Sequence, residues 1–377
     1  MALADRLKEQ ARQIGFDLVG IAPAVTPPGY ARFVDWLAAG FAGEMHYLPK
    51  YEQARAHPQT VLADVKSVVM VGMNYHQAPS RPASRASTTI TGRIATYAQG
   101  RDYHEILWER LDQLLAWVRQ ELPGSQGRAV VDTAPLLERD FARLAGLGWF
   151  GKNTMLLNKR IGSFFFLGAL LLTIELPPDP PMEVSHCGTC TACLDACPTK
   201  AFPAPGQLDA RKCISYLTIE LKGPIPVELR PGMGDWVFGC DICQDVCPWN
   251  RKAPPGTETD LQPRPGQAEP DLLELLALTP AAFRARFRDT PLSRPRRRGL
   301  LRNVAIALGN LRAPASLPAL LQALHDEEPL IRGAAAWALG QFGEPQCHEA
   351  LRTRFLLETD DTVKAEIRGA LHSSTAT

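Results

Sequence analysis

The sequence lacks a long hydrophobic run. Its longest apolar stretch, SFFFLGALLLTIEL at 163–176, is shorter than the roughly 18 to 20 residues that a membrane-spanning helix needs, and Gly168 interrupts it. We therefore exclude a membrane protein and expect this stretch to form two buried strands or a hairpin. An ordinary share of apolar residues, 45%, with 21% charged residues also excludes a disordered chain.

The N-terminus lacks the uninterrupted apolar core of a secretory signal. Leu3, Leu7, Ala11 and Ile14 instead fall on one face of a predicted helix, with charged residues between them. We accordingly expect a cytoplasmic protein. In that reducing compartment the nine cysteines are expected to be ligands or free thiols rather than disulfides.

The sequence also lacks a large net charge of either sign, because its formal charge is only +1. The charges are nevertheless uneven along the chain. Between 284 and 302 there are eight arginines and a single acid, Asp289. This segment predicts a local basic patch in an otherwise balanced protein.

The first 180 residues alternate helical and extended patterns, which indicates an α/β domain with a largely buried sheet. Helices are predicted at the N-terminus, over 31–39 and 103–122 and from about 135, and strands over 16–22, 67–75 and 128–131. Residues 181–254 are instead rich in Cys, Pro and Gly. A segment that buries so little apolar surface is usually held together by bound metal.

The last part of the chain repeats itself. LLRNVAIALGNL at 300–311 returns as LIRGAAAWALGQF at 330–342, and VKAEIRGAL, which ends at 371, is a weaker echo. A period of about 30 residues is typical of an α-solenoid and resembles short HEAT-type repeats, which present a surface to a large partner. We therefore divide the chain into an α/β domain (1–180), a ferredoxin-like cysteine domain (181–254), a linker (255–290) and an all-α HEAT-like repeat tail (291–377).

Seven of the nine cysteines fall into two runs with metal-ligand spacing. Cys187-x2-Cys190-x2-Cys193-x3-Cys197-Pro198 has the spacing of bacterial ferredoxins. Cys240-x2-Cys243-x3-Cys247-Pro248 lacks a leading cysteine, and Cys213 lies upstream to replace it. Because the cysteine before proline crosses to the other cluster in two-cluster ferredoxins, we predict two 4Fe–4S clusters. Their ligands are Cys187, Cys190, Cys193 and Cys247 for one, and Cys197, Cys213, Cys240 and Cys243 for the other.

Two structural zinc sites are the alternative, because zinc also binds four thiolates. The x2, x2, x3 spacing that ends in proline favours iron–sulfur clusters, whose iron prefers soft anionic ligands. Cys347 has no partner nearby in the sequence and is expected to be a buried structural thiol. Two neighbouring clusters pass electrons one at a time and need an acceptor, which we expect in the α/β domain.

Outside the cysteine runs, most of the candidate functional residues lie in the stretch VVDTAPLLERDFARLAGLGWFGKNTMLLN at 130–158. Asp132 follows a predicted strand and precedes a predicted helix, where open α/β sheets place functional groups. The alternative is that Asp132 or Thr133 merely caps that helix. Three glycines around Trp149, followed by Lys152 and Asn153, predict a loop that closely approaches a ligand.

These motifs, together with GRDYH at 100–104, CISYLTIELKGPIP at 213–226 and GCDICQDVCPWN at 239–250, resemble the epoxyqueuosine reductases over nearly the whole chain. The resemblance implies a cobalamin-dependent oxidoreductase whose core is related to that of reductive dehalogenases. It implies reduction of epoxyqueuosine to queuosine at the wobble position of tRNA anticodons, the last step of queuosine biosynthesis. An external low-potential electron donor is then needed, and we expect a monomer that binds no membrane.

Cobalamin is implied by the resemblance alone. The D-x-H-x-x-G pattern that supplies a histidine to cobalt elsewhere is absent, and ATYAQGRDYH at 95–104 has no cysteine to supply a sulfur ligand. The resemblance gives Asp132 the role of proton donor, with a pKa raised by desolvation under the corrin ring. The implied corrin contacts are Arg55, Tyr97, Asp132, Lys152, Asn153, Ser215 and Asp241, and the alternative for the weaker of these, Arg55, Tyr97, Ser215 and Asp241, is a surface or packing role.

The basic segment is expected to contact the tRNA. Positively charged side chains there would neutralise phosphates of the anticodon stem, and the residues we predict for this role are Arg296, Arg297, Arg298 and Arg302. The alternative is a solvated helix face. Two other functions remain as alternatives for the whole chain: a reductive dehalogenase-like enzyme acting on a small organic substrate, and a non-catalytic electron-transfer subunit.

Overall fold

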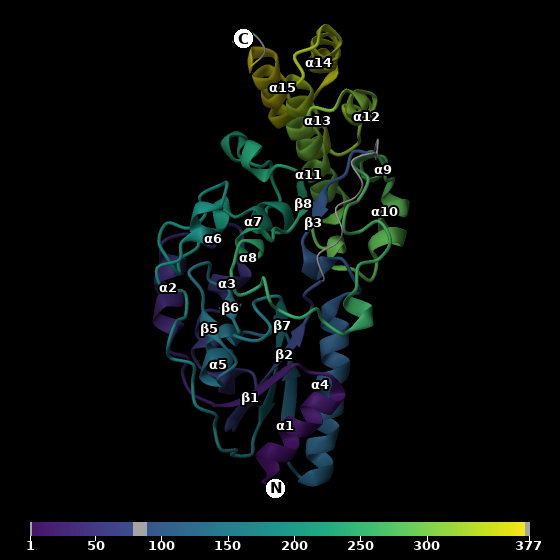
Figure 1. Cartoon of the computed structure of the whole chain (residues 1–377). Helices are drawn as coiled ribbons and strands as arrows, with labels where there is room; N and C mark the ends of the chain where they lie inside the picture. Colours follow the sequence, from purple (N-terminus) through teal and green to yellow (C-terminus); the bar gives the residue numbers. More distant parts are fainter. Residues whose placement is uncertain (1, 78–88, 374–377) are drawn as a thin grey trace. The chain divides into compact units, whose positions relative to one another are not determined.

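The computed structural model describes residues 2–77 and 89–373 of the chain (Figure 1). The chain divides into two compact units. The sheet unit comprises 1–79, 102–210 and 242–262, and the repeat unit comprises 80–101, 211–241 and 263–377. The cysteine-rich segment, which we expected to form a single domain, is divided between the two units.

The core of the sheet unit is a four-stranded sheet in the order β1-β2-β7-β4. Its strands are β1 (Leu18–Pro23), β2 (Ser67–Asn74), β7 (Phe165–Leu172) and β4 (Gly127–Val130), and every neighbouring pair is antiparallel. All residues of β2 are buried. This strand is therefore covered on both faces, which explains why its sequence is continuously apolar instead of alternating.

The apolar stretch at 163–176 forms one strand, β7, and not the two strands or hairpin that we expected. Gly168 does not turn the chain there. It pairs with Val71 inside the sheet, and a Cβ atom at this position would lie 3.0 Å from Cδ1 of Leu111. Glycine is used here because helix α4 (Tyr103–Glu121), which carries Leu111, packs closely against the strand.

The predicted helices of the sheet unit are present. They are α1 (Leu3–Ile14), α2 (Tyr30–Ala38), α4 and α5 (Glu138–Leu144), with shorter turns at α3 (Tyr47–Lys50), η1 (Gln53–Ala56) and η2 (Pro58–Thr60). Asp102 caps the N-terminus of α4, because its side chain accepts a hydrogen bond from the backbone N–H of His104 at 3.1 Å. This cap fixes Tyr103 and His104 in the first turn of α4.

The cysteine-rich segment contains little regular structure, as expected. Within the sheet unit it holds α6 (Ala192–Asp195) and α8 (Ile242–Asp245). The short antiparallel hairpin of β5 (Trp149–Phe150) and β6 (Leu156–Leu157) belongs to the same unit and carries the glycine-rich loop at its tip. In the repeat unit, α7 (Ile214–Ile219) precedes β8 (Trp236–Phe238), which pairs in parallel with β3 (Arg93–Ile94).

Residues 255–290, expected to be a linker, are in part helical. Helices α9 (Leu272–Leu276) and α10 (Pro280–Phe287) occupy the second half of this segment. Leu272 and Leu275 are fully buried, which explains why the chain folds there despite the proline-rich stretch before it. The remaining 3-10 turns of the chain are η3 (Thr96–Ala98), η4 (Ala210–Lys212), η5 (Val227–Leu229), η6 (Pro231–Met233), η7 (Thr259–Leu261), η8 (Pro291–Ser293) and η9 (Pro314–Ser316).

The predicted helical repeats are confirmed. The two related sequences and their echo form α11 (Arg296–Leu311), α13 (Pro329–Gly340) and α15 (Asp361–Ser373), with α12 (Leu317–Ala323) and α14 (Pro345–Leu357) between them (Figure 1). The stretch of α11 from Gly299 to Gly309 and nearly all of α13 are buried. The repeated glycines lie where these inner helices touch, because a Cβ on Gly309 would come within 2.8 Å of Ala338 and one on Gly340 within 2.8 Å of Ala370.

Replacing Gly340 by Leu is expected to destabilise the repeat unit by about 2 kcal/mol, because α13 and α15 must move apart to admit the side chain. Thermal unfolding measures the loss. The matched control is Gly369→Leu on α15, where an added Cβ meets no atom within 4 Å. Equal destabilisation by both changes would contradict this account of the small-residue pattern.

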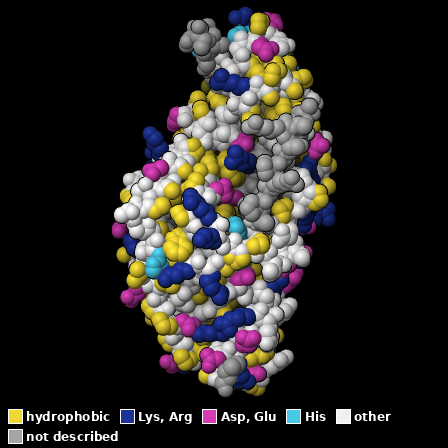
Figure 2. All heavy atoms as spheres, viewed as in Figure 1, with side chains coloured by type: hydrophobic (Ala, Val, Ile, Leu, Met, Phe, Trp, Pro, Cys, Tyr) yellow, Lys and Arg dark blue, Asp and Glu magenta, His cyan; other side chains and the backbone are white. Residues whose placement is uncertain are grey.

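No helix in the part of the chain that the structure describes is long and apolar enough to cross a bilayer. On the face drawn in Figure 2, basic side chains are interspersed with acidic ones and do not form a single block. The surface charge on this face therefore agrees with the balanced composition.

Candidate functional site

The first predicted set of cysteines comes together in the sheet unit. Cys187, Cys190, Cys193 and Cys247 line one cavity of about 240 Å³. Three of them belong to the first run, and Cys247 comes from the second, as the crossing rule for two-cluster ferredoxins requires. This cavity supplies four sulfur ligands of the kind that a 4Fe–4S cluster binds.

The thiols of this set are close enough to affect one another. Burial raises the pKa of the Cys193 thiol, and negative charge on Cys247 and Cys187 would raise it further. Burial likewise raises the pKa of Cys247. Four thiolates in this space need a cationic core to hold them.

The second predicted set is shared between the two units. Cys197 and Cys243 belong to the sheet unit, and Cys213 and Cys240 to the repeat unit. The Cys197 Sγ accepts a hydrogen bond from the backbone N–H of Ala201 at 3.3 Å. The assembly of these four residues around a second cluster stays a prediction.

The glycine-rich loop contacts both cysteine runs. Lys152 Nζ donates hydrogen bonds to the backbone oxygens of Gly188 at 2.8 Å and Cys190 at 2.9 Å. Asn153 is 3% exposed, and its Nδ2 donates to the backbone oxygen of Cys243 at 3.2 Å. The structure thus shows this loop in contact with the cysteine loops, while its approach to a ligand such as a corrin ring stays a prediction.

An acid–base cluster joins the start of α4 to the segment after β4. His104 is 6% exposed, and its ring nitrogens lie 2.6 Å from Asp102 Oδ1 and 2.6 Å from Asp132 Oδ1. The Tyr103 hydroxyl donates a hydrogen bond to Asp132 Oδ2. The Tyr103 ring stacks on Phe166 of β7, with centroids 4.1 Å apart, which anchors the cluster on the sheet.

Proton counting shows what this cluster can do. Each contact between a His104 nitrogen and a carboxylate oxygen requires one proton, and a neutral imidazole carries only one. The second proton must therefore reside on the imidazolium or on a carboxyl group. Asp132 lies at the accessible end of this row of hydrogen-bonded side chains, and its own side chain is 40% exposed. A proton can therefore pass from the cluster to a bound molecule through Asp132.

The alternative role for Asp132, capping the following helix, is excluded. The residue that caps α5 is Leu137, with no side-chain hydrogen bond, and the helix begins at Glu138. Asp132 does follow a strand, β4, but the sheet is antiparallel, so the rule for parallel sheets that singled it out does not apply. The described residues leave Asp132 partly exposed, so its expected burial depends on a bound cofactor.

Glu138 is a functional candidate that the sequence analysis missed. Burial raises the pKa of its carboxyl to about 8, and the negative charge of Asp132 contributes in the same direction. Its Oε1 atom is buried and has no hydrogen-bond partner among the described residues. An orphaned oxygen of this kind fits a ligand rich in amide groups. The sequence signal that could have identified Glu138 is its position as an acidic residue at the start of a helix, six residues after Asp132.

Arg55 belongs to the same region. It is 8% exposed, and its guanidinium lies 5.8 Å from the centroid of the Phe33 ring. One Nη donates to the backbone oxygen of Tyr51 at 3.0 Å. Burial lowers the Arg55 pKa, and the charge of Glu138 acts in the opposite direction.

The predicted corrin contacts are divided between the units. Four belong to the sheet unit (Arg55, Asp132, Lys152 and Asn153) and three to the repeat unit (Tyr97, Ser215 and Asp241). Asp241 is 5% exposed and accepts two hydrogen bonds of 2.7 Å from Thr96, one from the backbone N–H and one from the hydroxyl. It thereby fixes the turn that carries Tyr97, while the contacts of these residues with a corrin ring stay a prediction.

The prediction of Arg302 as a phosphate contact is wrong. This residue lies in the middle of α11 and is 1% exposed. Its guanidinium donates to the backbone oxygens of Leu217, Leu221 and Gly223 at 2.6 to 2.9 Å. Arg302 therefore holds the α7 segment against the first repeat.

Arg297 is also engaged within the repeat unit. It forms a two-pronged ion pair with Asp326, and its Nε donates to the backbone oxygen of Leu278 at 2.6 Å. The hydrogen bond with Asp326 raises the Arg297 pKa. Of the four arginines predicted to contact RNA, Arg296 is exposed and Arg298 is half-buried.

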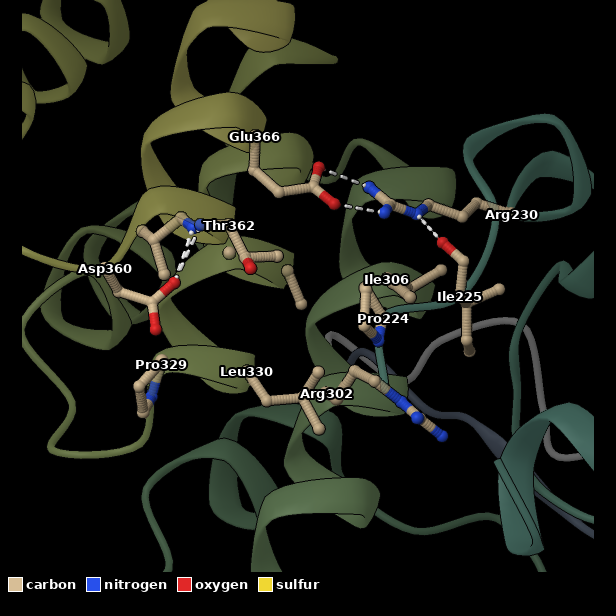
Figure 3. A pocket seen from close by; sticks show the side chains of 13 residues that line it. Pro224, Ile225, Arg230, Arg302, Ile306, Pro329, Leu330, Asp360, Thr362 and Glu366 are labelled. Carbon is tan, nitrogen blue, oxygen red and sulfur yellow. Dashed lines mark hydrogen bonds and ion pairs between the residues drawn. The ribbon is translucent and has the colours of Figure 1, made fainter. Parts of the chain in front are cut away.

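A second cavity, of about 180 Å³, lies in the repeat unit (Figure 3). Most of its lining is apolar, and Arg302 lies at its edge. The Arg230 guanidinium donates two hydrogen bonds to Glu366, so this charged pair is already satisfied. Arg302 and Asp360 also line this cavity, and both are hydrogen-bonded to backbone groups of the repeat unit, so we assign this cavity no catalytic role.

Comparisons with known proteins agree with this geometry. Residues 186–250 match a family of 4Fe-4S double cluster binding domains, and residues 295–372 match HEAT repeats. The fold and the cysteine site thus define an iron–sulfur oxidoreductase that carries a helical repeat domain. Residues 55–133 match a family described as epoxyqueuosine reductase QueG, DUF1730. The chain belongs to the epoxyqueuosine reductase family, as its relatives show over most of its length.

Two of these relatives are curated proteins named epoxyqueuosine reductase. The one from Pseudomonas aeruginosa is 44% identical over 91% of this chain and 95% of its own length, and the one from Escherichia coli K12 is 41% identical over 90% and 89%. A crystal structure of epoxyqueuosine reductase with an epoxyqueuosine-modified tRNA-Tyr stem loop is 33% identical. It superposes with a TM-score of 0.92 and covers 99% of both chains.

Proposed function

We propose that this protein reduces epoxyqueuosine to queuosine in tRNA anticodons. The observation that carries the proposal is the match over nearly the full length of the chain to relatives named for this reaction, one of them crystallised with the modified stem loop. The acid–base cluster at Asp132 and the cysteine cavity supply the two things that such a reduction needs, protons and a path for electrons.

The cofactors would be held by separate sets of residues. The eight cysteines of the two predicted sets would hold two 4Fe–4S clusters, and Arg55 and the orphaned Glu138 oxygen fit a corrin ring bearing amide groups. Tyr97, Lys152, Asn153, Ser215 and Asp241 complete the proposed corrin contacts. Cobalamin, when bound, supplies a reducible cobalt centre for the substrate, and the clusters supply it with single electrons from an external low-potential donor.

Asp132 is the proposed proton donor. Removing the epoxide oxygen as water consumes two electrons and two protons and breaks both carbon–oxygen bonds. Asp132 is accessible, one of its oxygens accepts a hydrogen bond from Tyr103, and the other lies 2.6 Å from a His104 ring nitrogen. When it carries the shared proton of this contact, Asp132 can give it to the departing oxygen and regain one through His104. Asp102 holds the other nitrogen of His104 and keeps the ring oriented.

The repeat unit is the proposed tRNA contact. With Arg302 and Arg297 engaged internally, exposed Arg296 and half-buried Arg298 are the members of the original set left to meet phosphates. The N-terminal α/β region of 1–180 would hold cobalamin, 181–254 the clusters and 291–377 the RNA. Because the substrate is a tRNA, we also propose that this reaction takes place in the cytoplasm.

The test is reconstitution under anaerobic conditions with iron, sulfide and cobalamin. We expect about eight iron atoms per chain, binding of cobalamin, and conversion of an epoxyqueuosine stem loop with a low-potential reductant. A chain that binds zinc in place of iron, or rejects cobalamin, would overturn the proposal. Turnover of small organohalides without turnover of the stem loop would instead favour the dehalogenase-like alternative.

The double change Arg296→Ala with Arg298→Ala is expected to weaken stem-loop binding without changing the rate at saturating RNA. Two lost phosphate contacts lower the slope of log K against log salt by about 1.5. The matched control replaces Arg352 and Arg368, which are exposed elsewhere on the repeats, by Ala. An equal salt slope in both double variants would remove the proposed RNA surface.

A further inference from the structure

Lys152 connects the β5–β6 hairpin to the loop of the first cysteine run. Its ammonium nitrogen donates to the backbone oxygens of Gly188 at 2.8 Å and Cys190 at 2.9 Å. The same loop is closed by a hydrogen bond from the Cys190 backbone N–H to the Cys187 backbone oxygen at 3.1 Å. One side chain from a distant segment thus fixes the backbone between two of the four ligands.

Lys152 also lies in the wall of the cysteine cavity. Of the residues that line this cavity in the described part of the chain, Lys152 is the one Lys or Arg, and none is acidic. A 4Fe–4S core bound by four thiolates is negatively charged and becomes more so on reduction. A fixed ammonium beside it favours the reduced form, because opposite charges attract more strongly as the negative charge grows.

The loop is also open to water. Cys190 is exposed, and an added Cβ at Gly188 would meet no atom within 4 Å. The backbone of this loop therefore receives little support from packing. Solvent access, hydrogen bonding and nearby charge are the protein's means of setting the potential of an iron–sulfur cluster. Lys152 supplies the nearby charge, and its hydrogen bonds to the Gly188 and Cys190 oxygens hold the loop backbone where packing supplies little support.

We infer that Lys152 is a positioning residue for the cluster held by Cys187, Cys190, Cys193 and Cys247, whose loop it fixes and whose reduction potential it raises. The inference rests on the proposed function only in requiring that this cluster is bound. It gives Lys152 a role in electron delivery that is distinct from contact with a corrin ring. Reduction of this cluster by a given donor is then easier than it would be for an unsupported loop.

The experiment compares Lys152→Gln and Lys152→Arg with the unaltered full-length chain after anaerobic reconstitution with iron and sulfide alone. Redox titration followed by electron paramagnetic resonance measures the two clusters separately. In Lys152→Gln we expect the ratio of reduced to oxidised cluster to fall about tenfold at a fixed potential, a shift of about 59 mV, for one cluster only. Lys152→Arg keeps the charge and should recover most of the shift.

Cys190→Ser identifies the cluster concerned, because it alters the signal of the first cluster. A shift of that signal, or a loss of iron confined to that cluster that Lys152→Arg restores, supports the inference. Unchanged potentials in Lys152→Gln, equal effects on both clusters, or no advantage of Arg over Gln would overturn it. Because neither cobalamin nor tRNA is present, failure of the proposed reaction would leave this measurement interpretable.

Discussion

Asp132→Asn is expected to lower the rate of epoxide reduction by about 10³-fold, since a positioned general acid contributes on that order. The amide has nearly the shape of the carboxyl group but cannot give a proton to the departing oxygen. Its nitrogen also cannot accept a hydrogen bond, such as the one that Tyr103 donates to Asp132 Oδ2. Single-turnover assays on the epoxyqueuosine stem loop measure the loss, with iron and cobalamin content recorded for each preparation. Unchanged turnover would assign the proton to another group.

Glu138→Gln is the matched control for Asp132→Asn. The raised pKa of Glu138, about 8, means that its carboxyl is protonated and neutral below that pH and becomes an anion above it. Gln therefore resembles the native group at pH 7, and we expect similar rates there. Between pH 7 and 9 the unaltered protein gains a negative charge beside Asp132 and should slow, while Glu138→Gln should not. A strong loss at pH 7 would show that the proton of Glu138 is itself required.

Cys193→Ala is expected to remove one cluster completely. Iron should fall from about eight to about four atoms per chain, and reduction of the stem loop should fall by at least about 10³-fold because electrons then lack half of their path. Cys193 lines the cavity with three other cysteines, and no nearby cysteine of the described structure is left over to replace it. Iron analysis and the same single-turnover assay test both parts.

Cys347→Ala supplies the control for cysteine loss. Cys347 is fully buried in α14, as the sequence predicted for a structural thiol, and burial raises its pKa. Its replacement should leave iron content and activity unchanged and cost only packing energy. If Cys193→Ala retained the full iron content, the assignment of the first cluster would fail.

The spacing of the cysteines was the most informative pattern in the sequence, because it predicted which of them lie together. In two-cluster ferredoxins three ligands of a cluster come from one short run and the cysteine before proline crosses from the other run. The grouping of Cys187, Cys190, Cys193 and Cys247 could therefore be predicted, and these four residues are seen around one cavity. The helical repeats were equally predictable, because their small residues recur where neighbouring helices must touch, as at Gly309 and Gly340.

Side-chain networks between distant segments were not predictable. Tyr103 and His104 contact Asp132 because the fold brings the start of α4 close to the end of β4. No local sequence pattern predicts this contact. Lys152 was singled out for a glycine-rich loop, yet its partners are carbonyl groups of the cysteine run. Backbone oxygens carry no sequence signature, so such contacts emerge only from the folded chain.

The sequence by itself determined the grouping of the four cysteines around the first cavity, the alternation of helices and strands before them and the repeats after them, because each follows from the spacing or periodicity of residue types along the chain. Only the tertiary structure decided which arginine side chains are free of internal packing and can meet a partner. Arg296 and Arg302 are six positions apart on one helix, yet one is exposed and the other is buried against carbonyl oxygens. Burial and partner geometry are set by packing between segments, and local sequence does not encode them.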